Sequence, residues 1–136
     1  MVAHAKFPVE VLTPEGEVFI GEVEMVSTRT TAGLIGILAR HAPLLATLEP
    51  TELRLYKTDT DIVRLAQSEG YLQVGDNHAL ILVEQARPVA ELDADDLRER
   101  LRIAERELEE AGDDTERRRV VERDRQRWER FLSLTQ

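Results

Sequence analysis

The spacing of apolar residues changes near Pro88, and this change restricts the chain to two kinds of structure in series. Before Pro88, short apolar runs alternate with turn-forming residues about every 8–12 positions, which is typical of strands. After Pro88, glycine is nearly absent and apolar residues recur at intervals of three and four, which is typical of helices. Pro88 disfavours helical backbone in the residue before it and is expected to end the last strand.

The apolar runs of the first part predict β-hairpins joined by short polar turns. Two pairs of runs flank such turns: 53–56 with 62–66, and 70–74 with 79–83. The run Val18–Met25 predicts one further strand, with Glu22 and Glu24 on its solvent-facing side. We therefore expect an N-terminal antiparallel β-sandwich over residues 1–87.

The stretch from Gly33 to Pro50, GLIGILARHAPLLATLEP, is the part of this region most suited to binding. Two glycines, a short apolar run, the pair Arg40–His41, a proline and a second apolar run follow one another. This order predicts a tight turn, a strand, a polar knuckle and a second strand. Because loops held by a rigid scaffold often carry binding residues, we expect a binding corner here and no catalytic centre.

His41 has two interpretations that the residues alone leave even. It is either a loop histidine whose imidazole bonds the backbone, or a contact residue in a corner that docks onto a partner.

Residues 88–136 are expected to form an antiparallel hairpin of two helices. Asp93 is the expected N-cap of the first helix, and Gly112 is expected to end it. The first helix has a narrow apolar seam: Leu97, Leu101, Ala104, Leu108 and Ala111. Residues 113–115 can cap a second helix that runs to about Leu132. Its main apolar stripe contains Val121, Trp128 and Leu132, interrupted by Arg125.

The formal net charge of −9 is unevenly distributed, and only residues 112–136 carry an excess of cations. An acidic chain argues against general nucleic-acid binding, which depends on neutralising phosphates. The cations of this segment are all arginines, which either form a solvated helix face neutralised by nearby carboxylates or recognise carboxylate or phosphate groups. They are Arg117, Arg118, Arg119, Arg123, Arg125, Arg127 and Arg130.

No pattern predicts catalysis, a metal site or a bound cofactor. Cysteine is absent, and the phosphate-binding glycine motifs are missing. The three histidines, His4, His41 and His78, lack the spacing of metal ligands. There is no apolar run of transmembrane length, and Met1–Glu10 has no secretory pattern. We expect a soluble intracellular protein that is not an enzyme.

Three stretches resemble the epsilon subunit of bacterial-type (F-type) rotary ATP synthases. The first is the Gly33–Pro50 stretch, with its Gly-Ile-Leu and His-Ala-Pro-Leu. The second is SEGYLQVGDNHALILVEQA, residues 68–86, which is similar to the family's glycine–aromatic hairpin. The third is the pair of charged helices containing AEREL, residues 104–108.

The resemblance implies a non-catalytic rotor subunit at the cytoplasmic face of the cell membrane, held there peripherally through the complex for proton-driven ATP synthesis. The sandwich would link the gamma subunit to the membrane rotor ring. The corner would face that ring through Gly33, Leu34, Gly36, Arg40, His41 and Pro43. The helices of residues 88–136 would inhibit ATP hydrolysis, with the seven arginines meeting acidic segments of catalytic subunits.

This chain departs from the family pattern at two places. Leu34 stands where the family often has an acidic residue. Some members bind ATP where the first helix begins, and Leu92 and Asp93 match that signature. Asp96 and Leu97 replace its arginine and alanine, and because an anion at position 96 repels a triphosphate, we predict that no ATP is bound.

A second interpretation comes from another functional class. The chain could be a free-standing sandwich adaptor whose arginine helix binds an acidic partner or RNA. An RNA-binding sheet would carry basic and aromatic residues together, whereas this one is acidic and poor in aromatics.

Overall fold

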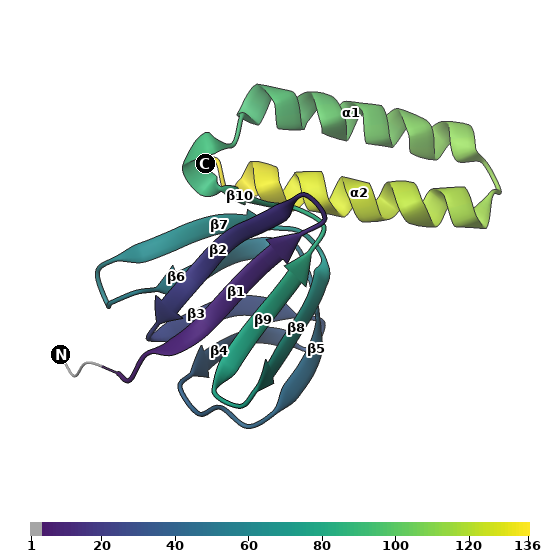
Figure 1. The fold of residues 1–136 in the computed structure, drawn as a ribbon. Helices are drawn as coiled ribbons and strands as arrows, with labels where there is room; N and C mark the ends of the chain where they lie inside the picture. Colours follow the sequence, from purple (N-terminus) through teal and green to yellow (C-terminus); the bar gives the residue numbers. More distant parts are fainter. Residues whose placement is uncertain (1–3) are drawn as a thin grey trace. The chain divides into compact units, whose positions relative to one another are not determined.

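The computed structural model describes residues 4–136. Residues 1–3, the start of the Met1–Glu10 segment, lie outside the described residues. The chain divides into two compact units, Met1–Val89 and Ala90–Gln136, which are described separately below. Figure 1 shows that the first consists of strands and the second mainly of two helices.

Ten strands make up the described part of the first unit. They are β1 (Phe7–Thr13), β2 (Gly16–Val23), β3 (Met25–Thr30), β4 (Gly33–Leu38), β5 (Leu44–Leu48), β6 (Thr51–Tyr56), β7 (Ile62–Gln67), β8 (Gly70–Gly75), β9 (His78–Val83) and β10 (Ala86–Pro88). The strands expected in the two hairpins, and both hairpins themselves, are therefore confirmed.

The strands follow one another in the order β10-β7-β6-β3-β5-β8-β9-β1-β2, with β4 paired to β3. The neighbours β3 and β5 pair at their ends, through Thr30 and Leu48. The sandwich is not entirely antiparallel as expected, because β1 and β9 run parallel from Val9–Ala79 to Leu12–Leu82. A parallel pair needs a long connection, and here the other strands supply it.

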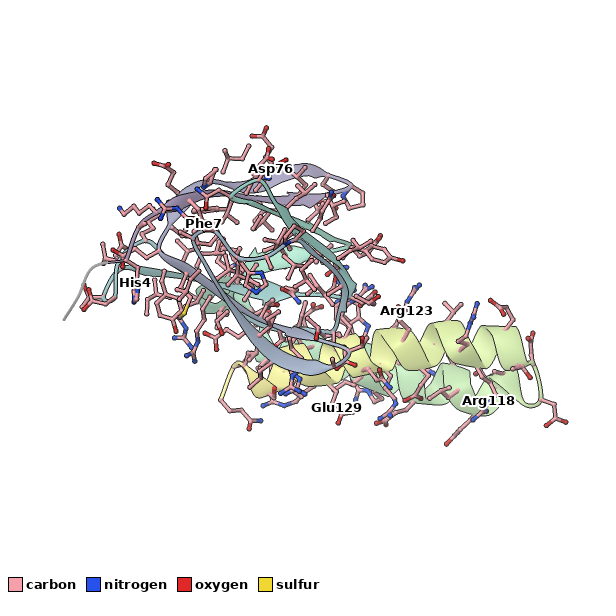
Figure 2. All side chains as sticks on the ribbon, turned by 90° about the horizontal axis from the view of Figure 1, so that it is seen from below. His4, Phe7, Asp76, Arg118, Arg123 and Glu129 are labelled. Carbon is pink, nitrogen blue, oxygen red and sulfur yellow. The ribbon has the colours of Figure 1, made fainter. Side chains whose placement is uncertain are left out.

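The sheet encloses a core built from alternating positions. In β1 the inner residues Phe7, Val9 and Val11 are almost fully buried, and Phe7 is labelled in Figure 2. Inner positions of the remaining strands add the rest: Val23, Val26, Ile37, Leu48, Leu53, Leu55, Leu65, Leu72, Val74, Ala79, Ile81 and Val83. Each of these valine, leucine, isoleucine and phenylalanine side chains contributes about 1.5–3 kcal/mol through burial.

The expected single strand from Val18 to Met25 is wrong. The chain forms β2 and then β3, with Glu24 between them and only 8% exposed. The amide of Glu24 bonds the carbonyl of Tyr56 at 2.7 Å, because the chain leaves β1 here to pair with β6. The alternation restarts at this step, so Glu24 does not lie on the solvent side.

Gly70 permits the closest approach between two strands. It pairs with Val83, and a Cβ at position 70 would lie 2.0 Å from the carbonyl oxygen of Leu82 and 2.7 Å from Val83 Cα. Contacts this short with backbone atoms cannot be relieved by moving a side chain. The glycine at the start of the second sequence stretch is therefore required by the pairing of β8 with β9.

A single carboxylate holds two arginines that face each other across β6 and β7. Arg54 and Arg64 are directly opposite, an arrangement that is unfavourable for like charges. Glu52 accepts hydrogen bonds from both, at 3.3 Å from Arg54 Nε. The bond from Arg64, aided by Arg54, holds the pKa of Glu52 below its ordinary value.

A 3-10 turn (Val89–Glu91) begins at the last residue of the first unit. The second unit then contains α1 (Ala94–Ala111) and α2 (Thr115–Ser133), which pack along each other. Asp93 caps α1 by accepting from the amides of Asp95 and Asp96 at 3.0 and 3.2 Å. Gly112 follows with φ 55°, and Asp114 caps α2. The predicted caps and the break between the helices are confirmed.

The buried face of α2 differs from the predicted stripe. Its buried residues are Val121, Arg127 and Phe131, whereas Trp128 is only half-buried. The Trp128 ring meets Phe131 edge-on at 6.2 Å, and the guanidinium of Arg100 on α1 lies 5.0 Å from its centre. The stripe is shifted because an arginine with its aliphatic stem can cover apolar surface.

We expect Gly70→Ala to lower the free energy of unfolding by about 3 kcal/mol, since β9 must move away from β8. Gly75→Ala is the matched control, because a Cβ at position 75 meets nothing within 4 Å and should change stability by less than about 0.5 kcal/mol. Urea unfolding of both variants measures the difference, and equal stabilities would contradict the close approach.

We expect Glu52→Gln to cost about 1 kcal/mol at pH 7, because it leaves Arg54 and Arg64 opposed without an anion. The folded-state pKa of Glu52 is lowered, so this stabilisation is complete above the unfolded carboxyl pKa of about 4.3. It is lost as the pH falls through the folded value. Urea unfolding at several pH values should show that the free energies of unfolding of wild type and Glu52→Gln become equal in acid. Glu22→Gln, at an exposed carboxylate, is the control at pH 7 and should change the free energy of unfolding by less than about 0.5 kcal/mol.

Candidate functional site

The corner of residues 33–43 consists of β4 and the knuckle that joins it to β5. Gly33 has φ 121°, which L side chains rarely adopt, so this position needs glycine. Thr30 supports the turn: its hydroxyl accepts from the Ala32 amide at 3.1 Å and donates to the Gly33 carbonyl at 3.1 Å. The backbone does not require Gly36 in the same way, since a Cβ there would meet only Met25 Sδ at 3.8 Å.

The outward side of β4 is apolar and exposed. Leu34 is 74% exposed, and Gly36 and Leu38 are also exposed. Leu34 lies opposite Arg29 of β3. Within the described residues β4 pairs only with β3, so its other edge has no strand partner.

The knuckle contains one residue at positive φ and two hydrogen bonds made by His41. Arg40 has φ 62°, an uncommon value for a residue other than glycine. The amide of His41 bonds the Leu38 carbonyl at 3.3 Å, and its Nδ1 donates to the Ala42 carbonyl at 2.6 Å. The first interpretation of His41 is therefore confirmed: its imidazole bonds the backbone. Its contact with a partner stays a prediction, as do those of Arg40 and the exposed Pro43.

Asn77 joins this knuckle from the turn between β8 and β9. Its side-chain oxygen accepts the Arg40 amide at 2.7 Å, a link across 37 residues. The neighbouring turn residue Asp76 projects at the tip of this hairpin (Figure 2). Sequence reasoning did not place Asn77 in the site. The available signal was an asparagine where a two-residue hairpin turn usually has glycine.

A second exposed surface, the apolar sheet face, follows the corner along the outer side of β5, β8, β9, β1 and β2. Leu45 is 73% exposed, Tyr71 58% and Leu82 42%. Tyr71 pairs with Leu82, and Leu82 pairs with Leu12. Sequence reasoning missed this face, although β9 is apolar on both sides. Its members are Leu12, Ile20, Leu45, Tyr71, Leu80 and Leu82.

The α2 arginines are engaged largely within the helical unit. Arg119 bonds Glu116 at 2.6 Å, and Arg125 bonds Glu122 at 2.5 Å. The bond from Arg125 holds the pKa of Glu122 below its ordinary value.

Three other arginines of α2 have different environments. Arg118, labelled in Figure 2, donates to the carbonyls of Leu108 and Gly112 at 3.0 and 3.3 Å. Arg123 contacts Asp124 at 3.1 Å. Arg127 is buried, with its guanidinium 5.4 Å from the Trp128 ring. The exposed positions suited to an outside partner are Arg117, Arg119 and Arg130.

The residues matched to the ATP signature have structural roles at the start of α1. The carboxylate of Asp93 is used in capping, and Leu92 is half-buried. Asp96 pairs with Arg100 at 2.8 Å. The absence of ATP binding stays a prediction.

Across residues 4–136, no three or more acidic or histidine side chains converge as metal ligands. Within the same residues, neither helix is long and apolar enough to cross a membrane.

Comparisons with known proteins agree on one family. Residues 6–89 match the model of the ATP synthase delta/epsilon chain β-sandwich domain. The ATP synthase epsilon chain of Halalkalibacterium halodurans is 40% identical over 104 residues, which cover 76% of this chain and 77% of that protein. The epsilon chain of a Sulfurihydrogenibium species is 31% identical over 128 residues, 94% of this chain and 96% of that protein.

Two solved structures share the fold. A chain of the Euglena gracilis mitochondrial ATP synthase aligns with a TM-score of 0.81 at 20% identity, covering 100% of this chain and 85% of that one. A chain of the Tetrahymena thermophila mitochondrial ATP synthase central stalk and c-ring aligns with a TM-score of 0.68 at 17% identity, covering 99% of this chain and 100% of that one. The strand unit, its glycine corner and the matches along most of the sequence show that the chain belongs to the ATP synthase epsilon-chain family.

Proposed function

We propose that this protein is a non-catalytic subunit of the central stalk that links the gamma subunit to the membrane rotor ring of a proton-driven ATP synthase. The observation that carries the proposal is the corner of residues 33–43, an exposed element held rigidly by the strand unit. The similarity to epsilon chains supplies the complex in which such an element would act.

The corner is suited to contact with the rotor ring. Its outward row of Leu34, Gly36 and Leu38 is apolar, and the knuckle adds Arg40 and His41 beside it. Since the turn at Gly33 and the bond from the Arg40 amide to the Asn77 side chain restrain the backbone, little conformational entropy is lost on docking. At position 34 the corner presents a leucine instead of a charged residue. Its contact with the rotor ring at this position would therefore be apolar packing.

The apolar sheet face is suited to the gamma subunit. Exposed large residues on one continuous sheet surface mark an interaction site, and an aromatic residue near the centre is typical of an energetically important contact. Tyr71 occupies that place, between Leu82 on one neighbouring strand and Thr47 on the other. Because β5 continues directly from the knuckle, one rigid unit presents both surfaces and can transmit torque between two partners.

The helical unit of residues 88–136 would act as a brake on ATP hydrolysis. Arg117, Arg119 and Arg130 are exposed on α2 and can meet acidic segments of catalytic subunits. The complex would hold the protein peripherally at the cytoplasmic face of the cell membrane.

We expect Leu82→Glu to weaken binding to the purified gamma subunit about thirtyfold, since it places a charge in a contact worth roughly 2 kcal/mol. Val120→Glu is the control, because Val120 is 40% exposed but lies on α2. Its affinity should stay within about threefold of wild type. Equal losses in both variants, measured by titration calorimetry, would contradict this assignment of the gamma surface.

We expect deletion of residues 91–136 to raise ATP hydrolysis by the assembled complex. The triple change Arg117→Gln, Arg119→Gln, Arg130→Gln should reproduce a rise of roughly threefold to tenfold, since each exposed ion pair contributes up to about 1 kcal/mol. The control is Arg98→Gln, Arg102→Gln, Arg106→Gln, which removes the same charge from α1. If ATP hydrolysis is unchanged after the deletion, the helical unit has no inhibitory role. If ATP hydrolysis rises equally in the α1 control, these three arginines are not specifically responsible for inhibition.

A further inference from the structure

We propose that Asn77 is a positioning residue for the corner: it locks the knuckle in the conformation that binds the partner. This inference rests on the proposed function for the identity of that partner. The lock itself is the 2.7 Å bond between the Asn77 side-chain oxygen and the Arg40 amide.

Positive φ at this position of the turn between β8 and β9 suits either glycine or asparagine, so the turn alone does not select asparagine. Gly75 pairs with His78, so Asp76 and Asn77 form a two-residue loop, and both have positive φ, 51° and 56°. Such a loop prefers glycine at its second position, because glycine adopts positive φ without steric cost. A glycine would suit the hairpin at least as well. What asparagine adds is a side-chain acceptor, and that acceptor is directed at the corner.

The receiving residue also lies in an unfavourable conformation that needs support. Arg40 has φ 62°, which an L residue other than asparagine or aspartate seldom adopts. Its amide donates to Asn77, and the next bond of the knuckle, from the His41 amide to Leu38, is longer at 3.3 Å. The amide of the strained residue is therefore held by a side chain from another hairpin.

The lock determines where the knuckle presents its side chains. The His41 imidazole is oriented by its bond to the neighbouring Ala42 carbonyl, so its direction follows the backbone that Asn77 holds. When the lock is lost, Arg40 can leave positive φ, and the Arg40 and His41 side chains then sample several directions. Ordering them again opposes binding, so the affinity for the partner falls while the fold remains.

Three full-length variants separate positioning from stability. Asn77→Gly keeps the turn and removes the acceptor, and Asn77→Asp keeps an acceptor. Asp76→Gly is the matched control, a glycine at the adjacent positive-φ position of the same turn. Amide hydrogen exchange at Arg40, read by NMR, reports the lock. Affinity for a purified assembly of gamma subunit and rotor ring reports its consequence.

We expect Asn77→Gly to speed exchange at Arg40 at least tenfold and to weaken binding about tenfold, with a thermal midpoint no lower than that of Asp76→Gly. Asn77→Asp should stay within about threefold of wild type in both measurements, and Asp76→Gly should match wild type. The proposal would be overturned if the amide exchange rate of Arg40 were unchanged in Asn77→Gly. It would also be overturned if Asn77→Gly and Asn77→Asp lost affinity for the assembly equally. If the wild-type protein does not bind the assembly of gamma subunit and rotor ring, the proposed function is wrong. The rate of amide hydrogen exchange at Arg40 then tests on its own whether Asn77 holds the knuckle.

Discussion

The strand unit depends on the burial of an unbroken apolar inner surface, which fixes the direction of every outward side chain. Because strand residues alternate sides, burying Val9, Val11 and Ile81 forces Leu12, Leu80 and Leu82 outward. A slip of one residue would reverse this arrangement and place charges such as Glu10 in the core. The apolar sheet face is therefore held by the same register that stabilises the unit.

Elements that are determined by residues close together in the chain could be predicted from the sequence. The hairpins around 58–61 and 75–78, the caps at Asp93 and Asp114, and the break at Gly112 each depend on residues within a few positions of one another. The corner was predictable for the same reason, since its turns and short strands are encoded in consecutive residues. A resemblance of short motifs then pointed to the family, which comparison over most of the chain bears out.

The remaining features depend on which distant segments become neighbours. Glu24 is buried because the chain changes pairing partners there, and no periodicity within β2 reports that change. Asn77 belongs to the corner through a bond to a residue 37 positions away. The role of Gly70 appears only when Leu82 and Val83 are placed beside it. Arg127 lies on the buried side of α2, with its guanidinium 5.4 Å from the Trp128 ring, although its residue type favours exposure. Spacing rules score residue types along one segment and cannot register such contacts.

The contacts of the α2 arginines limit the kind of inhibition that the proposed function would allow. Arg119 and Arg125 bond carboxylates three residues away, so they keep these partners wherever the unit lies. Binding an acidic partner replaces one exposed ion pair by another, so each replacement changes the free energy of binding only slightly. Inhibition would then arise from several weak contacts made together, and salt would screen all of them. Such a brake is easily released, as a regulatory element requires, because no single buried charge pair has to be broken.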